Sequence, residues 1–170
     1  MNSSSGEPRL ATVTIPAPDV RPGAFLDLAA GRARGFWARG GRWVAHCGAV
    51  AEIESGPQER GDRFAGVETE AVALAKDPVL PDRATRAPVV RFYGGFSFRE
   101  DHRPEGAWRG FSPALFHLPE FEVEGDDSGD AWLRARALVR PEEVEGILAS
   151  LRRRAEALRA DLTALGSRGL

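Results

Sequence analysis

Residues 89–98 of the chain have the sequence VVRFYGGFSF, and two further motifs follow them, WRGF at residues 108–111 and ALFHLPE at residues 114–120. Aromatic and β-branched residues favour β-strands, and a proline such as the one near the end of the third motif interrupts a strand. These segments therefore predict two strands with a connection between them. The Gly94-Gly95 pair matches no phosphate-binding pattern, and we interpret it as a bulge or a close backbone contact.

Other short strands are predicted along the chain. Residues 11–15 contain alternating β-branched residues before Pro16, and Gly40-Gly41 suits a hairpin turn because glycine adopts the positive φ angles that such turns require. The further expected strands lie at residues 35–39, 42–53, 115–123 and 131–139. Short connections favour antiparallel pairing, so we predict one predominantly antiparallel sheet.

Three segments have helical patterns. Pro22 suits the first turn of a short helix that ends at Gly31, and Asp62 is well placed to cap a helix that continues to Ala75. From Pro141 onward, hydrophobic residues recur at steps of four and three and predict a long amphipathic helix. Its apolar seam consists of Val144, Leu148, Leu151, Ala155, Leu158, Leu162 and Leu165. The expected fold class is α+β, with a predominantly antiparallel sheet and packing helices.

The composition limits the classes of protein to which the chain can belong. A chain of 170 residues with 42% hydrophobic content can bury one sizeable core, and a net charge of -2 disfavours nucleic acid and membrane surfaces as partners. The single cysteine, Cys47, excludes an internal disulfide, and the sequence has neither a secretory-signal pattern nor an apolar run of membrane-spanning length. We therefore expect a cytoplasmic protein with a tail at residues 1–10, an α+β portion at 11–140 and the amphipathic helix at 141–170.

Several acidic residues could suggest a metal site. Glu120, Glu122 and Glu124, followed by Asp126 and Asp127, could offer oxygen ligands to Mg²⁺. Alternating acids are also typical of the solvent face of a half-buried strand, and this is the interpretation that we prefer.

The other polar and aromatic residues also have structural interpretations. His46 and Cys47 point to opposite faces of a strand and cannot easily share a metal ion, and His102 and His117 have no zinc-ligand spacing. The arginines of the last helix suggest a solvated basic face, with a nucleic-acid-binding or dimerising helix as the alternative; they are Arg152, Arg153, Arg154 and Arg159. The tryptophans are expected in the core; they are Trp37, Trp43, Trp108 and Trp132.

A series of motifs between Phe36 and Pro119 resembles the amino-terminal region of isochorismate synthases, which are chorismate-using enzymes. The series begins with the aromatic-Trp strand and a strand of small residues, continues with a Gly-Asp-Arg-Phe helix start, and ends with aromatic-Gly-Gly-Phe-x-Phe, Trp-x-x-Phe and aromatic-x-Leu-Pro. Their positions here are Phe36-Trp37, residues 46–53, residues 61–64, residues 93–98, residues 108–111 and residues 116–119.

The resemblance implies a partial chorismate-binding-enzyme fold, similar to that of anthranilate synthase, and a role in isochorismate formation for menaquinone or siderophore biosynthesis. In the family, a lysine in a Lys-Val-Val-Leu-Ala-Arg type segment is the general base, a glutamate is the acid, and further glutamates hold Mg²⁺. This chain has no such segment, and its one lysine, Lys76, stands in a different context. We therefore assign no catalytic, cofactor-binding or metal-binding residue, and we expect the partner to be a missing catalytic half, in the same polypeptide or in a split gene product.

Two alternatives remain. The chain could be a stand-alone, non-catalytic domain derived from the family that binds a partner or a small ligand. It could also belong to a sister enzyme such as anthranilate or aminodeoxychorismate synthase. The second alternative is weakened because those relatives tend to carry a Gly-Tyr-containing strand and a Leu-Leu-Glu-Ser regulatory element, and neither occurs here.

Overall fold

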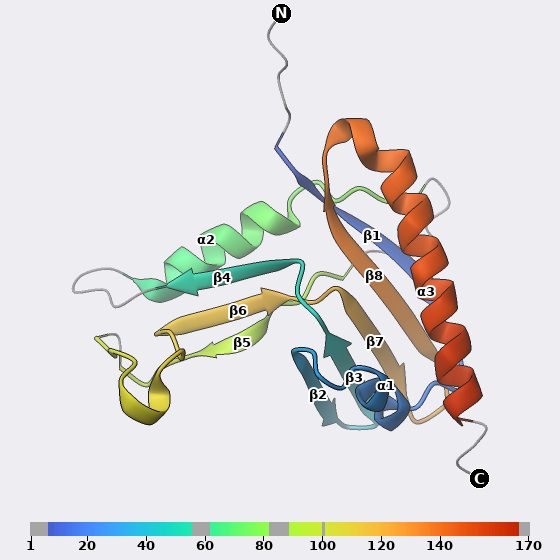
Figure 1. The fold of residues 1–170 in the computed structure, drawn as a ribbon, viewed down its shortest axis with the longest axis horizontal. Helices are drawn as coiled ribbons and strands as arrows, with labels where there is room; N and C mark the ends of the chain where they lie inside the picture. The colour runs from blue at the N-terminus through green and yellow to red at the C-terminus, as the bar shows by residue number, and fades with distance from the viewer. Residues whose placement is uncertain (1–6, 56–61, 82–88, 100, 167–170) are drawn as a thin grey trace, which may run out of the picture.

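The computed structural model describes residues 7–55, 62–81, 89–99 and 101–166. They form one five-stranded and one three-stranded antiparallel sheet, with three α-helices packed against them (Figure 1). The predicted α+β class is confirmed. The prediction of a single sheet is wrong, because two segments expected as continuous strands bend and enter different sheets.

The five-stranded sheet has the strand order β1-β8-β7-β3-β2. In that order its strands are β1 (Arg9–Pro16), β8 (Ala131–Val139), β7 (Phe121–Asp126), β3 (Arg42–Cys47) and β2 (Arg34–Arg39). Helices α1 (Pro22–Leu28) and α3 (Val144–Gly166) cover one face, and Figure 1 shows α3 lying along β1 and β8. The larger hydrophobic core lies between this face and the two helices, with Phe25, Leu133 and Leu151 among its buried members.

The three-stranded sheet projects from the five-stranded sheet and has its own core (Figure 1). Its order is β4-β6-β5, where β4 is Ala51–Ser55, β6 is Ala114–Leu118 and β5 is Tyr93–Phe96. Helix α2 (Arg63–Ala75) covers one face, and Ile53, Val67 and Ala114 are buried there. A short 3-10 helix, η1 (Gly106–Trp108), lies in the connection from β5 to β6.

Two bends connect the sheets. Gly48 separates β3 from β4 and has a φ of +68°, which glycine adopts without the steric cost that a side chain brings. Pro119 separates β6 from β7. The sequence pattern predicted uninterrupted strands at 42–53 and 115–123, and both predictions are wrong. The pattern of strand-forming residues continues through each bend, so it does not show where the chain changes sheets.

Most local predictions are confirmed. Strands β2 and β3 pair across the Gly40-Gly41 turn, where both glycines have positive φ angles. The Asp62 carboxylate caps α2 by accepting hydrogen bonds from the backbone N–H groups of Phe64 and Ala65. Strand β1 starts at Arg9, so it includes two residues that the sequence analysis assigned to the tail.

The long last helix packs as predicted for an amphipathic helix. A 3-10 turn, η2 (Pro141–Glu143), leads into α3, whose residues Leu151, Ala155 and Leu162 are buried against the five-stranded sheet. The interpretation of a core-packing helix is therefore confirmed. Although α3 is the longest helix, neither it nor any other helix in the described ranges is long and apolar enough to cross a membrane.

Adjacent glycines of β5 allow a matched test of the close backbone contact. A Cβ atom added to Gly94 would lie 2.0 Å from the backbone oxygen of Leu115, whereas a Cβ at Gly95 would meet nothing within 4 Å. We expect Gly94→Ala to lower the free energy of unfolding by about 1–3 kcal/mol, because the β6 backbone must move. Gly95→Ala should change it by no more than about 0.5 kcal/mol. Urea unfolding measures both, and equal effects would contradict the packing described.

Candidate functional site

The face of the five-stranded sheet opposite α3 carries buried charged residues. Glu122 and Glu124 project from β7, and Arg134 and Arg136 project from β8, alternating along each strand with residues that face the larger core. Glu122, Arg134 and Arg136 have no exposed surface, and Glu124 is 8% exposed. The prediction that these glutamates lie on a solvent face is therefore wrong. The segment that leads into β5 lies against them.

These residues form a connected set of ion pairs. Arg134 donates from Nη1 to Glu122 Oε1 at 2.9 Å and from Nη2 to Glu124 Oε2 at 2.8 Å. Arg91, just before β5, donates to the same two carboxylates at 2.8 and 3.2 Å. Arg136 donates to Glu122 Oε2 at 3.3 Å. We call Arg91, Glu122, Glu124, Arg134 and Arg136 the Arg–Glu layer.

Within the Arg–Glu layer, ion pairs compensate most of the buried charge. Burial by itself raises the pKa of Glu124, but the hydrogen bond and charge of Arg134, with the charge of Arg91, outweigh this effect and hold that pKa below its usual value. Three guanidinium groups meet two carboxylates, so the layer has an excess of positive charge. Within the described residues, the Nε atoms of Arg134 and Arg136 are buried without a hydrogen-bond partner.

A group of aromatic and imidazole rings adjoins the layer where the two sheets meet. The ring of Tyr93 on β5 stacks on that of His46 on β3, with centroids 3.8 Å apart. His46 Nδ1 lies 3.3 Å from His117 Nε2 on β6, and the Tyr93 hydroxyl donates to Glu122 Oε2 at 3.1 Å. Burial, followed by the proximity of His117, lowers the pKa of His46 to about 4, and burial also lowers the pKa of His117. Burial raises the pKa of Tyr93.

A pocket of about 380 Å³ opens beside the Arg–Glu layer. Trp37, Arg42, Arg91 and Tyr93 line it together with Glu124, which pairs with both arginines. A carboxylate that already neutralises guanidinium groups is a weak proton acceptor, because those groups favour its charged form. The arrangement is therefore better suited to holding the sheets together than to general-base catalysis.

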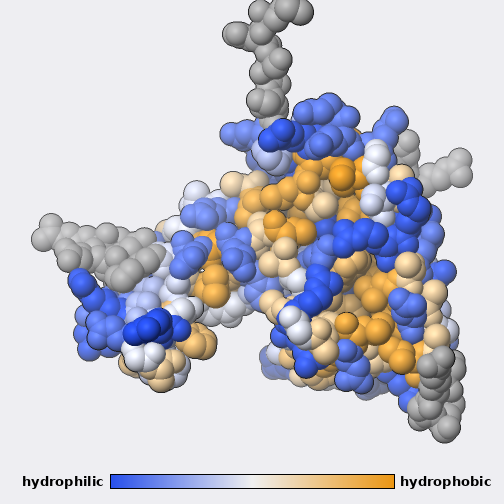
Figure 2. Space-filling view, in the orientation of Figure 1, coloured by the Kyte–Doolittle hydropathy of each residue, from blue (hydrophilic) through white to orange (hydrophobic). Residues whose placement is uncertain are grey.

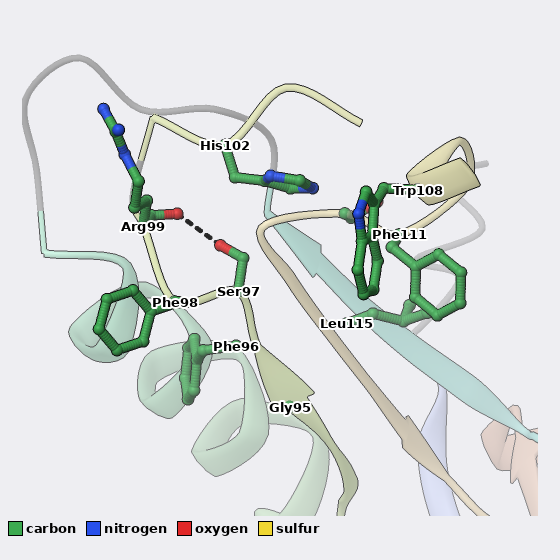
Figure 3. Close-up of a pocket in the computed structure, with 10 residues that line it drawn as sticks. Gly95, Phe96, Ser97, Phe98, Arg99, His102, Trp108, Phe111 and Leu115 are labelled. Atoms are coloured by element: carbon green, nitrogen blue, oxygen red, sulfur yellow. Dashed lines mark hydrogen bonds between the residues drawn. The ribbon is translucent and has the colours of Figure 1, made fainter. Parts of the chain in front are cut away.

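A second pocket, of about 590 Å³, lies at the far end of the three-stranded sheet (Figure 3). Figure 3 shows Trp108, Phe111 and Leu115 on one side and Ser97 and His102 on the other. Trp108 is 62% exposed and Phe111 is 60% exposed. The rim residue Phe98 is fully exposed. We call Phe98, Trp108, Phe111 and Leu115 the aromatic face.

The expectation that all four tryptophans are in the core is wrong. Trp37 and Trp108 are more than half exposed, while Trp43 and Trp132 are partly buried. Figure 2 shows that hydrophobic surface, drawn in orange, is visible on the main body and also on the projecting part of the molecule. Such exposed aromatic groups mark a surface that can accept a partner or a ligand.

Arg63 and Phe64, from the Gly-Asp-Arg-Phe motif, hold the base of the aromatic face. Arg63 is only 6% exposed, and its Nη1 donates to Ser97 Oγ at 2.9 Å and to the Arg99 carbonyl at 3.1 Å. The next residue, Phe64, packs on Phe96 with ring centroids 4.4 Å apart. Asp62 caps the start of α2, while Arg63 and Phe64 fix this helix against β5 and the loop after it.

The described residues do not form a Mg²⁺ site of the kind that the resemblance implies. Glu120 is paired with Arg32 and Arg154, and the other two glutamates of the strand belong to the Arg–Glu layer. Within the described ranges, no group of three His, Cys, Asp or Glu residues is arranged to hold a metal ion. A carboxylate surrounded by guanidinium groups is not free to coordinate a hard cation.

Lys76 belongs neither to the Arg–Glu layer nor to the aromatic face. It follows the last residue of α2, is exposed, and lines a shallow pocket with Arg9 and Asp77. Nothing in this arrangement desolvates its ammonium group, as a lysine general base requires.

Sequence reasoning placed His46, His117 and the glutamates on strands but missed the contacts between them. The missed signal is the alternation of arginines at 134 and 136 on a strand that follows acids at 122 and 124. Opposite charges at every second position of neighbouring strands point to cross-strand ion pairs. The contact of His46 with His117 spans 71 residues, and no local pattern indicates it.

The chain also matches a known protein family. The family described as "Chorismate binding enzyme" matches residues 1–167 of the chain. No curated protein matches it.

The Arg–Glu layer can be tested by removing one buried charge. Glu122→Gln keeps the size of the side chain but leaves Arg134 and Arg136 facing a neutral amide. We expect the free energy of unfolding to fall by about 3–5 kcal/mol, because buried guanidinium charges lose their compensation.

The matched control is Glu156→Gln, which breaks an exposed pair with Arg152 on α3. Its effect should be no more than about 0.5 kcal/mol. Urea unfolding at pH 7 compares the two variants, and a Glu122→Gln protein as stable as the control would show that the layer does not stabilise the fold.

Proposed function

Because the chain belongs to the chorismate-binding enzyme family, we propose that it is the amino-terminal scaffold of an isochorismate synthase, which converts chorismate to isochorismate. The family match over residues 1–167 is the observation that carries the proposal. The isochorismate synthase assignment within the family rests on the motif series from Phe36 to Pro119.

The positions of the motif residues support a scaffold role. Asp62 caps α2, Arg63 holds the loop after β5, and Gly94 allows β5 to approach the backbone of β6. Each of these residues is used in packing. These motif residues therefore contribute to the framework of the fold.

The chemistry of the reaction places further requirements on the protein. Moving a hydroxyl group on chorismate requires a base to activate water, an acid for the departing hydroxyl and a cation to neutralise carboxylate. The described residues offer no uncommitted set of this kind, and the contacts of Lys76 do not suit a base. We propose that a catalytic half supplies these groups, in the same polypeptide or in a separate one, for menaquinone or siderophore biosynthesis.

The aromatic face is the surface that we assign to the catalytic half. Phe98, Trp108 and Phe111 are more than half exposed in a part of the molecule that projects from the main body. Clustered aromatic side chains in water are characteristic of protein interfaces. Most of the seam of α3, by contrast, already packs against the chain's own sheet, with Leu151, Ala155 and Leu162 buried there.

That burial of α3 favours one alternative function. The chain covers its larger sheet with its own last helix, as a stand-alone domain must do. A non-catalytic domain of the family that binds a partner or ligand is therefore the second candidate.

The proposal can be tested first by activity. We expect the purified chain to convert no chorismate, with or without Mg²⁺, because Glu120, Glu122 and Glu124 are committed to guanidinium groups and the lysine is exposed. Chromatographic detection of isochorismate measures this, with an enzyme-free blank as the control. Product above the blank would refute the scaffold role.

The presence of a catalytic half can be tested by sequencing the gene and the DNA beside it. A reading frame in or beside this gene that encodes a Lys-Val-Val-Leu-Ala-Arg type segment is expected, and its product should restore isochorismate formation when co-expressed with this chain. Failure of such a product to bind the chain would favour the stand-alone domain.

The aromatic face can be tested by substitution. Phe98→Ser removes a fully exposed aromatic ring, so it should reduce the binding of a hydrophobic dye and any self-association, with little change in stability. The control is Val72→Ser, at a 62% exposed position on α2 outside the aromatic face. Dye fluorescence and light scattering compare the variants. A monodisperse parent protein that binds no dye would contradict an interface role for this surface.

A further inference from the structure

The two sheets meet through polar side chains. Each sheet has its own buried apolar cluster, and the two clusters do not share a residue. The Arg–Glu layer and the His46, Tyr93 and His117 rings lie between them. A polar junction responds to protonation in a way that an apolar core does not, because its groups can gain charge.

The two histidines occupy equivalent positions at the bends. His46 on β3 stands two residues before Gly48, and His117 on β6 stands two residues before Pro119. Their nitrogen atoms are 3.3 Å apart, close enough for a hydrogen bond in which one neutral ring donates and the other accepts. Two protonated rings carry only donors, so they lose this bond and repel each other.

We propose that the His46–His117 pair forms an acid-sensitive hinge, at which protonation loosens the three-stranded sheet and α2 from the five-stranded sheet while each sheet keeps its own fold. Other described ties between the two parts are the ion pairs of Arg91 with Glu122 and Glu124, and the backbone pairing of Val79 with Leu10 and Thr12. Side chains of Arg136 and Arg9 also donate to the carbonyl groups of Val89 and Asp77. The loosened part stays attached through these ties.

The charged groups around the His46–His117 pair do not cancel the repulsion between its protonated rings. Glu122 on β7 attracts a proton on His46, but Arg91, Arg134 and Arg136 already neutralise that carboxylate. Glu52 on β4 pairs in register with His117 and attracts its proton, but it is exposed to solvent.

The remaining surfaces around His46 are uncharged. From β2, Gly35 packs against the His46 ring and adds no charge. From β5, the Tyr93 hydroxyl, whose pKa burial raises, remains protonated through the acidic range. Burial and the neighbouring imidazole therefore decide the direction of the response.

The direction of the pH dependence follows from the pKa of His46 in the closed and open forms. An exposed histidine takes a proton near pH 6.5, whereas His46 in the closed junction takes one only near pH 4. Between these values the open form binds more protons than the closed form. The closed form is therefore fully favoured above pH 6.5. Below that value, the equilibrium constant for opening rises about tenfold per pH unit for each additional proton that the open form binds.

A distance measurement tests the hinge directly. Spin labels at Glu68→Cys on α2 and Arg153→Cys on α3 occupy exposed positions on the two parts. Cys47 is buried, and the parent protein taken through the same labelling reaction gives the background control. From pH 7.5 to 5, we expect the distance distribution to broaden, with the broad fraction constant above pH 6.5 and rising about tenfold or more per pH unit below it until it saturates. Far-UV circular dichroism should stay unchanged over this range.

Histidine variants identify the titrating groups. His117→Gln should reduce the broad fraction at pH 5 about tenfold, and His46→Gln serves as the second variant if the first does not fold. His102→Gln, in the loop at the aromatic face, is the matched control and should behave like the parent. An unchanged distribution down to pH 5, or a broadening that coincides with loss of circular dichroism, would overturn the hinge. Equal broadening in His117→Gln, His46→Gln and the parent would overturn it as well.

Discussion

The ion pairs of the Arg–Glu layer are the interactions on which the arrangement of the two sheets depends. Burying carboxylates and guanidinium groups costs several kcal/mol for each ion unless close partners compensate the charge. Here Arg134 contacts both Glu122 and Glu124, while Arg91 reaches the same carboxylates from the segment that leads into β5. The strand pairing of β7 with β8 and the position of β5 are thus linked by the same charges.

On either side of this layer, each sheet has its own apolar core. The five-stranded sheet buries its apolar face under α1 and α3, and the three-stranded sheet buries its apolar face under α2. The result is one chain with two apolar clusters and a polar junction. Such a junction fixes geometry through directed hydrogen bonds, whereas an apolar contact fixes mainly the area that is buried.

In this architecture, residues of the family motifs serve the packing of the chain. The motif residues Asp62, Arg63 and Gly94 are needed to cap a helix, to hold a loop and to let two backbones approach. Residues with such roles are recognisable in a sequence even where the described part of the molecule presents no free base, acid or metal cage. In the aromatic face, in contrast, Phe98, Trp108 and Phe111 remain more than half exposed in the described structure.

The local elements could be predicted from sequence, because strand alternation, helical periodicity, the Asp62 cap and the Gly40-Gly41 turn depend on residues close together in the chain. At Gly94-Gly95 the pattern predicted a bulge or a close backbone contact, and the close contact is found at Gly94. The division into two sheets was decided only by the tertiary structure, since the pattern continues through the bends at Gly48 and Pro119. The same is true of the burial of Glu122, whose arginine partners come from different strands, and of the His46–His117 contact. A strand pattern shows that side chains alternate between two faces, but only the folded chain decides what covers each face.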